Sequence, residues 1–257
     1  VYKRQVLPCT TFEGAFKAVE NGSAALAVLP VENTVAGRVA DIHRLLPGYN
    51  LYIIGEYFMR IRHCLLGLSG ASVDGLTHVR SHEMALGQCR HIINELNLEP
   101  VVSADTAGSA REIAELNDPA LAAIASPLAA EINGLQIFKE NIEDAKHNTT
   151  RFLVMAPEPD DAEPNSGDVI TSFIFRCRNV PAALYKALGG FATNGVNITK
   201  LESYQIEGSF MATQFYADIE GHPDDEAVRL ALDELNYFCS ELNILGVYPA
   251  AEFRKKM

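Results

Sequence analysis

The sequence predicts an α/β protein with two globular parts joined by a linker, and three observations support this prediction. Apolar runs alternate with helical patterns over residues 1–155, which indicates helices layered on a mostly parallel sheet or two. Residues 156–167 hold three prolines, four acids and a closing glycine, a composition typical of an exposed linker. Residues 168–257 follow a strand–helix–strand–strand–helix–strand pattern, the order of a ferredoxin-like module.

The elements of the first part are predicted from apolar runs and helical periodicity. Strands are expected at Ala24–Leu29, Leu51–Ile54, Thr77–Val79, Pro100–Val102 and Leu121–Ala125. Helices are expected at Phe12–Val19, His82–Leu96 and Ala107–Leu116. Thr106 is suited to cap the helix that follows it, and Ser126-Pro127 pairs an N-cap with proline at the first helical position.

The second part contains six shorter elements in residues 168–257. We expect, in chain order, the strand Asp168–Arg176, a helix from Pro181 to Gly195, the strands Val196–Tyr204 and Phe210–Ile219, the helix Asp224–Cys239 and the strand Ile244–Tyr248. A turn at Glu207-Gly208 would join the two middle strands as a hairpin.

Composition narrows the class of protein. The 257 residues carry a formal net charge of −12, which argues against nucleic-acid binding because that requires a basic face. No apolar stretch approaches the roughly 20 residues of a membrane span, and the first residues resemble no secretory signal. Five separated cysteines without a CxxC pair indicate neither a disulfide framework nor a zinc site. We therefore expect a cytoplasmic protein without a metal site.

Four polar clusters lie at predicted strand ends or helix starts. They are Pro30–Val39, Ser81-His82, Ser103–Ala110 and His147–Phe152. Ligands bind beyond the carboxyl ends of strands in α/β sheets, and helix starts bind anions. Two such starts suit a ligand with two carboxylates. Ordinary turns and helix caps are the competing interpretation of each cluster.

Together the clusters resemble the prephenate dehydratase family, including arogenate dehydratases, in order and spacing. The stretches that carry the resemblance are Leu29–Val39, Ser81–Cys89, Asp105–Ala110, Ala123–Ser126 and Asn148-Thr149-Thr150-Arg151-Phe152. In the last part, Asn197–Ser203 resembles a segment of the family's ACT regulatory domain. The resemblance implies a two-lobed, periplasmic-binding-protein-like catalytic domain (1–155), the linker (156–167) and an ACT domain (168–257).

The sequence also departs from the family pattern in three places. Family members usually begin with a strand and a Gly-rich loop upstream of Val1, so we expect a missing wall of the pocket or a truncated chain. In the predicted ACT domain, Pro181-Ala182-Ala183-Leu184 stands where Gly-Ala-Leu is usual, and Tyr204-Gln205 stands where Arg-Pro is usual. The latter change leaves the strength of effector binding, and the identity of the effector, open.

The resemblance implies the roles of individual residues. The dehydratase reaction removes CO₂ and water from prephenate, and no cofactor is implied. Thr150 would donate to the leaving hydroxyl with help from Glu32 or His147, so the expected catalytic residues are Thr150 and Glu32. The residues expected to bind or orient substrate are Asn33, Thr34, Ser81, His82, Thr106, Arg151 and Phe152. For Arg151 the sequence leaves two roles open, gripping a carboxylate or bracing the motif by pairing with Glu32. Phe152 is expected to pack beneath the pocket.

For the ACT domain we expect L-phenylalanine as the effector, bound at the interface of a homodimer or homotetramer. Leu184 and Asn197 would lie near the amino acid, and Glu202 and Ser203 would transmit its effect. Two alternatives remain open at this point. Besides a prephenate dehydratase, the chain could be an arogenate dehydratase or a two-lobed sensor that binds amino acids and catalyses nothing.

Overall fold

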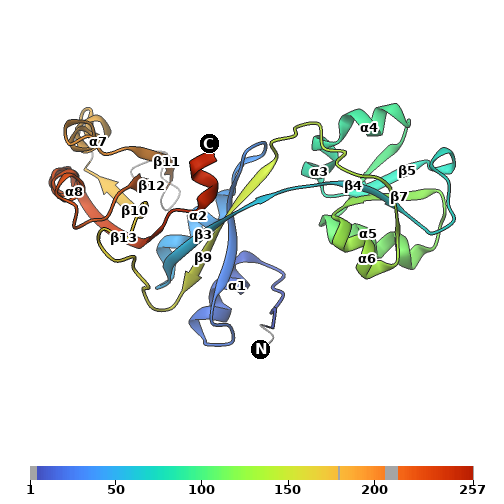
Figure 1. The fold of residues 1–257 in the computed structure, drawn as a ribbon, viewed down its shortest axis with the longest axis horizontal. Helices are drawn as coiled ribbons and strands as arrows, with labels where there is room; N and C mark the ends of the chain where they lie inside the picture. The colour runs from blue at the N-terminus through green and yellow to red at the C-terminus, as the bar shows by residue number, and fades with distance from the viewer. Residues whose placement is uncertain (1–4, 179, 206–213, 257) are drawn as a thin grey trace. The chain divides into compact units, whose positions relative to one another are not determined.

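The computed structural model describes residues 5–178, 180–205 and 214–256 (Figure 1). The helices are α1 (Phe12–Glu20), α2 (Ala40–Leu45), α3 (Glu83–Gln88), α4 (Arg90–Glu95), α5 (Thr106–Leu116), α6 (Pro127–Asn133), α7 (Ala183–Thr193) and α8 (Glu226–Phe238), with 3₁₀ turns η1 (Leu46–Gly48), η2 (Val73–Gly75) and η3 (Glu252–Lys256). The strands are β1 (Ala27–Asn33), β2 (Gly37–Arg38), β3 (Tyr52–Arg60), β4 (Cys64–Gly67), β5 (His78–Ser81), β6 (Glu99–Val102), β7 (Leu121–Ala125), β8 (Gln136–Lys139), β9 (Thr149–Ala156), β10 (Val169–Cys177), β11 (Ile198–Tyr204), β12 (Gln214–Glu220) and β13 (Cys239–Pro249).

The chain forms two compact units that do not follow the boundaries expected from the sequence. Unit 1 comprises residues 1–32, 38–58 and 151–257, and unit 2 comprises residues 33–37 and 59–150. The chain therefore passes between the units four times, after residues 32, 37, 58 and 150. No helix or strand is found between β9 and β10, so the predicted linker is irregular. It nevertheless packs on β13, because the Ala162 amide donates to the Val247 carbonyl.

Unit 2 is built on a five-stranded sheet in the order β6-β5-β7-β4-β8. Strand β5 pairs in parallel with β6 and β7, whereas β4 pairs antiparallel with β7 and β8. Helices cover both faces (Figure 1). Leu65 and Ile124 pack with α3 and α4, whereas their strand neighbours Leu66 and Ala123 pack with α5 and α6. The sheet is therefore mixed and includes β4 and β8, two short strands that the sequence analysis did not predict.

Unit 1 contains a sheet in the order β2-β1-β9-β3 and a second sheet in the order β11-β12-β10-β13. The two sheets share one core, in which Leu29, Val31, Ile53 and Leu153 cluster with Ile170, Ile174, Tyr216, Leu245 and Tyr248. The sheets approach closely at Gly246, where an added Cβ would lie 1.9 Å from the Ile53 carbonyl oxygen. Only glycine fits such a contact.

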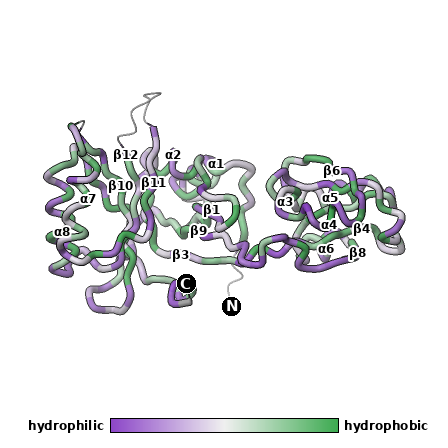
Figure 2. The backbone as a smooth tube through the Cα atoms, turned by 90° about the horizontal axis from the view of Figure 1, so that it is seen from above, coloured by the Kyte–Doolittle hydropathy of each residue, from purple (hydrophilic) through white to green (hydrophobic). Residues whose placement is uncertain are grey.

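The C-terminal sheet has the ferredoxin-like strand order that the sequence predicted. Its strands pair antiparallel, and α7 and α8 lie side by side on one face (Figure 2). Phe173, Phe175 and Ile219 on that face pack with helix residues such as Phe191 and Leu235. The predicted turn at Glu207-Gly208 lies outside the described residues. Within the described ranges, no helix is long and apolar enough to cross a membrane.

Helix starts follow local side-chain chemistry. Ser126 accepts from the Ala129 amide, with Pro127 in the first turn, which confirms that predicted cap. The helix expected over residues 82–96 is instead two helices, because Cys89 has non-helical dihedrals. The Asp144 carboxylate accepts from the amides of Arg90 and His91. A distant segment thus caps the second helix, which no local pattern could reveal.

Candidate active site

Asn33 and Thr150 are brought together by two strands far apart in sequence. Asn33 is the last residue of β1, and Thr150 is the second residue of β9, its neighbour in the sheet. Asn33 Nδ2 donates to Thr150 Oγ1 at 2.9 Å and to Asn148 Oδ1 at 2.7 Å. Thr150 and Asn148 are buried, whereas Asn33 is partly exposed. The structure therefore joins two of the predicted clusters through side-chain hydrogen bonds.

The hydrogen bonds continue to two residues outside the predicted site. Asn148 Nδ2 donates to Gln88 Oε1 at 2.9 Å. His63 Nε2 lies 3.0 Å from the same oxygen, and since a carbonyl oxygen only accepts, Nε2 carries the proton. We call Asn33, Gln88, Asn148 and Thr150 the amide cluster. Gln88 and Asn148 both lie in stretches that carried the family resemblance, and this was the available signal for them. His63 had none.

The loop after Asn33 is fixed by Thr34 and by Asn33 itself. Thr34 Oγ1 donates to the His147 carbonyl at 2.8 Å and accepts from the Thr149 amide at 3.0 Å. Asn33 Oδ1 accepts from the amides of Val35 and Ala36. The Thr34 hydroxyl thus holds the loop against the start of β9, and the Asn33 side chain both folds the loop and contacts Thr150.

One residue beyond Thr150, the side chain of Arg151 is buried among acids. Its Nε donates to Glu56 Oε2 at 2.7 Å, its Nη1 to Glu32 Oε1 at 3.0 Å and also to Asp218, and its Nη2 to the Tyr248 hydroxyl at 2.9 Å. Only 2% of the side chain is exposed. Of the two roles left open by the sequence, the contacts include the pairing with Glu32, and a role of Arg151 in binding substrate stays a prediction.

Further charges complete this arrangement. Lys200 Nζ lies 2.6 Å from Glu32 Oε2, and Arg254 binds Glu56 with Nε at 2.6 Å and Nη2 at 2.9 Å. We call Glu32, Glu56, Arg151, Lys200, Asp218 and Arg254 the ion network. It contains three acids and three bases, so its formal charges cancel, as the burial of charged groups requires.

The ion network sets the ionisation of its acids. Burial raises the pKa of Glu32, but Lys200 and Arg151 outweigh it and hold this pKa below its ordinary value. Burial likewise raises the pKa of Asp218, and Arg151 and Ser172 lower it further than burial raises it. Both groups are carboxylates at neutral pH. Glu32 cannot supply a proton there, and its expected catalytic role stays a prediction.

Three predicted substrate-binding residues lie next to helix starts, and their role in binding substrate stays a prediction. Ser81 is fully buried and its hydroxyl donates to the Ile124 carbonyl at 2.6 Å, so it forms a hydrogen bond within the sheet. His82, not Ser81, caps α3, because its Nδ1 accepts from the Met84 amide. Asp105, not Thr106, caps α5. Two neighbouring polar residues stand at each of these helix starts, so the sequence did not show which of the two caps the helix. Phe152 is half-buried in β9.

The residues expected at the effector site lie on the C-terminal sheet and α7. Leu184 is half-buried on α7 and packs against the core between helices and sheet. Asn197 is exposed and its Nδ2 donates to Glu220. Glu202 lies 3.4 Å from Arg38 Nη1, which also donates to the Ser203 carbonyl at 2.8 Å. Their role in effector binding stays a prediction.

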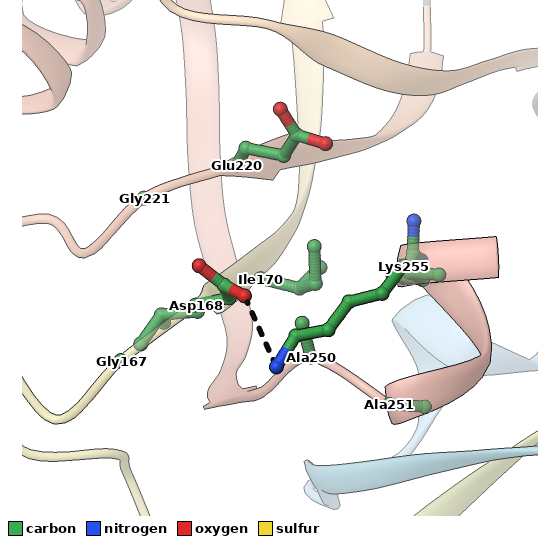
Figure 3. Close-up of a pocket in the computed structure, with 10 residues that line it drawn as sticks. Gly167, Asp168, Ile170, Glu220, Gly221, Ala250, Ala251 and Lys255 are labelled. Carbon is green, nitrogen blue, oxygen red and sulfur yellow. Dashed lines mark ion pairs between the residues drawn. The ribbon is translucent and has the colours of Figure 1, made fainter. Parts of the chain in front are cut away.

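A cavity of about 490 Å³ lies at one end of the C-terminal sheet (Figure 3). Asp168 and Lys255 form an ion pair across it at 3.6 Å, and Glu220 lies on the neighbouring strand. Arg254 also lines this cavity. The residues that line it include none of the predicted catalytic, substrate or effector residues, and Arg254 is its one member of the ion network.

The amide cluster suits proton donation to a leaving group. A hydroxyl can accept and donate at once. Because Asn33 donates to Thr150 Oγ1, the threonine proton is directed away from that bond and toward a neighbouring acceptor. An amide donor also stabilises negative charge that develops on this oxygen. The arrangement fits a group that hydrogen-bonds departing hydroxide.

Comparison with known proteins identifies relatives of this chain. Residues 2–160 match the family profile of prephenate dehydratase. A bifunctional N-acyl-homoserine lactone acylase/prephenate dehydratase of Komagataeibacter europaeus is 52% identical, covering 97% of this chain and 89% of that protein. Arogenate dehydratase/prephenate dehydratase 2 of Arabidopsis thaliana is 38% identical, covering 95% and 66%. The crystal structure of prephenate dehydratase from Arthrobacter aurescens in complex with L-Phe is 31% identical, covering 96% and 82%, with a TM-score of 0.86.

Proposed function

The chain belongs to the prephenate dehydratase family and is a dehydratase lyase, and from this premise we propose that it converts prephenate to phenylpyruvate, water and CO₂. The observation that carries the proposal is the 2.9 Å hydrogen bond from Asn33 to Thr150. It joins the two polar clusters that the reaction requires and directs the threonine proton outward.

In the reaction, electrons move through the ring from the bond to the carboxylate toward the bond to the hydroxyl. The bond between the ring and its carboxylate breaks, and its electrons form the new ring double bond as CO₂ leaves. The ring hydroxyl departs and takes the proton of Thr150, which is replaced from solvent, so that water is the second product. Aromatisation provides the driving force, and the protein supplies orientation and the proton.

Substitution of Thr150 tests the proposal. Thr150→Ala removes the proton donor, and we expect kcat to fall by about 10²–10⁴-fold. Thr150→Ser keeps a hydroxyl and should retain most of the activity. Phenylpyruvate is measured by its absorbance in alkali. Thr77→Ala is the matched control, because this exposed hydroxyl bonds only His78 and Ala120. Full turnover by Thr150→Ala would reject the assignment.

Arogenate is the alternative substrate, because the relatives include proteins named for either acid. The two substrates differ in a keto or an amino group on the side chain. Parallel assays that compare kcat/KM for prephenate and arogenate decide between them. Phenylpyruvate forms from the first and phenylalanine from the second.

Feedback by L-phenylalanine through the C-terminal sheet is the proposed regulation. The Arthrobacter aurescens relative was solved in complex with L-Phe, and the C-terminal sheet here has the strand order expected for an ACT domain. We propose an assembly of two or four chains with phenylalanine at a subunit interface. Activity and sedimentation, each measured with and without millimolar phenylalanine, test both parts.

Hydrolysis of N-acyl-homoserine lactones is a second candidate activity. The relative whose name includes it is 52% identical over 97% of this chain, so the likeness extends through both parts of the protein. The chain would cleave the amide and release a fatty acid and homoserine lactone. Measuring homoserine lactone release by the native protein and by Thr150→Ala shows whether the activity exists and whether it depends on the same threonine.

A further inference from the structure

The chain passes between the units at four places. Within two residues of each place lies a side chain that forms a hydrogen bond or ion pair with a residue of the C-terminal part. Glu32 precedes the first passage and binds Lys200 of β11. Arg38 follows the second and binds Glu202 and Ser203. Near the third, Glu56 binds Arg254 of η3. After the fourth, Arg151 binds Asp218 of β12 and Tyr248 of β13. All these contacts lie within unit 1.

Two of these contacts lead directly to the amide cluster. Glu32 is bonded through one peptide link to Asn33, and Arg151 follows Thr150 in the same way. Asn33 and Thr150 are joined by the hydrogen bond that carries the proposed reaction. Lys200 and Asp218 therefore fix the residues on either side of this pair, although neither belongs to the amide cluster.

The charged side chains that make these contacts are buried, and burial restricts where they can lie. The Lys200 side chain is 8% exposed, and those of Asp218 and Glu56 are fully buried. In a medium of low dielectric an unpaired charge is costly, so each partner moves with the group it binds. Lys200 also binds Glu202 at 3.2 Å, and Glu202 is one of the residues expected to transmit the effect of phenylalanine.

We infer that Lys200 and Asp218 are positioning residues of the dehydratase: they orient Asn33 and Thr150 through Glu32 and Arg151, and Lys200 transmits the state of β11 to this pair. The inference rests on the proposed function. It assigns the ion network a role in catalysis and regulation in addition to its role in stability.

Lys200→Met in the full chain tests the inference. Methionine keeps most of the length of the side chain and removes its charge. Because small misplacements of reacting groups are costly, we expect kcat to fall about tenfold or more with KM changed less than about threefold, and inhibition by phenylalanine to weaken. Lys200→Arg keeps the charge and should restore most of both. Lys17→Met removes an exposed lysine paired with Glu13 on α1 and should leave kcat, KM and inhibition unchanged.

A double-mutant cycle identifies the route. In a Glu32→Gln background the carboxylate that binds Lys200 is absent, so Lys200→Met should lower kcat much less than it does in the native chain. An equal effect in both backgrounds would overturn the route through Glu32. A loss of stability in Lys200→Met with unchanged kcat would overturn the inference and leave a purely structural role.

Hydrogen exchange separates the inference from the proposed function. Peptides covering residues 31–37 and 147–152 should exchange faster in Lys200→Met than in the native chain or in Lys17→Met, because the Thr34–Thr149 contacts would loosen. If the native chain does not convert prephenate, the proposed function fails, and this measurement alone decides whether Lys200 orders the cluster. Unchanged exchange would then reject the inference.

Discussion

The amide cluster and the ion network begin one peptide bond apart and are held together by different means. Asn33, Asn148 and Thr150 are neutral and are joined by hydrogen bonds between uncharged groups. The residues next to Asn33 and Thr150 in the chain, Glu32 and Arg151, carry full charges, and each binds a charged partner from the C-terminal sheet. A neutral hydroxyl can donate a hydrogen bond to a departing oxygen without leaving a buried charge unpaired, whereas a change in one member of a charge pair leaves its partner uncompensated. Each motif thus places a residue of the proposed chemistry directly beside a residue of the ion network.

Arg151→Met tests the anchoring half of this comparison and should have the largest effect. The substitution leaves Asp218 fully buried without its main positive partner and removes one partner of Glu56. We expect the free energy of unfolding to fall by about 3–5 kcal/mol, measured by urea denaturation. Arg229→Met, at an exposed pair with Asp233 on α8, is the control. A native-like midpoint for Arg151→Met would show that the network does not anchor the fold.

His43 provides the second test, because it is buried beside the ion network. It is 2% exposed, packs edge-on against Tyr216 at 5.1 Å, and neither ring nitrogen has a hydrogen-bond partner among the described residues. Burial, and then the charge of Lys200, lowers the pKa of His43 to about 4. The unfolded chain, with an ordinary pKa of about 6.5, therefore binds this proton more readily, and stability is lost as the pH falls below about 6.5.

The expected size of this loss is about 3 kcal/mol between pH 7 and pH 4. Denaturation of His43→Leu across this range should show a flatter profile than the native chain. Glu32 and Asp218 act at lower pH, because their lowered pKa values place the loss of their contribution to stability below about 4.5. Parallel profiles of the two proteins above pH 4.5 would contradict a buried, neutral His43.

Asn33→Asp tests the amide cluster. Of the substitutions described here, it should have the smallest effect on the free energy of unfolding. Aspartate has the same shape and still accepts from the amides of Val35 and Ala36, but it cannot donate to Thr150. We expect kcat to fall about tenfold with little change in stability. Steady-state kinetics and urea denaturation of the same preparation measure both. A stability loss as large as that of Arg151→Met would erase the distinction between the two groups.

The sequence predicted the elements with strong periodicity and missed those that depend on distant partners. Strand β7 and the helices α1 and α5 occur close to their predicted bounds, because burial follows the apolar pattern there. Strands β4 and β8 are four residues long and gave little signal. The break at Cys89 arises from Asp144, more than fifty residues away, so helical periodicity continued across it.

The candidate site was predicted only in part, because some of its contacts also depend on residues that are distant in the sequence. The sequence singled out Glu32, Asn33 and Thr150, and the structure joins Asn33 to Thr150 directly. It could not assign Arg151, because the buried acids Glu56 and Asp218 come from separate strands. It assigned Ser81 to a ligand because a serine beside a helix start has the same pattern whether its hydroxyl faces a pocket or bonds a strand.

The shared core of unit 1 limits how the C-terminal sheet, the proposed site of regulation, can be changed. Ile170, Ile174, Tyr216, Leu245 and Tyr248 fill the same interior as the strands that carry Glu32 and Arg151. A shortened chain that ends at the linker would expose this apolar surface to solvent. It would also leave buried carboxylates without the positive charges that pair with them. The proposed inhibition by phenylalanine could therefore be changed by single substitutions, whereas removal of the C-terminal part would also remove part of the core that supports the catalytic strands.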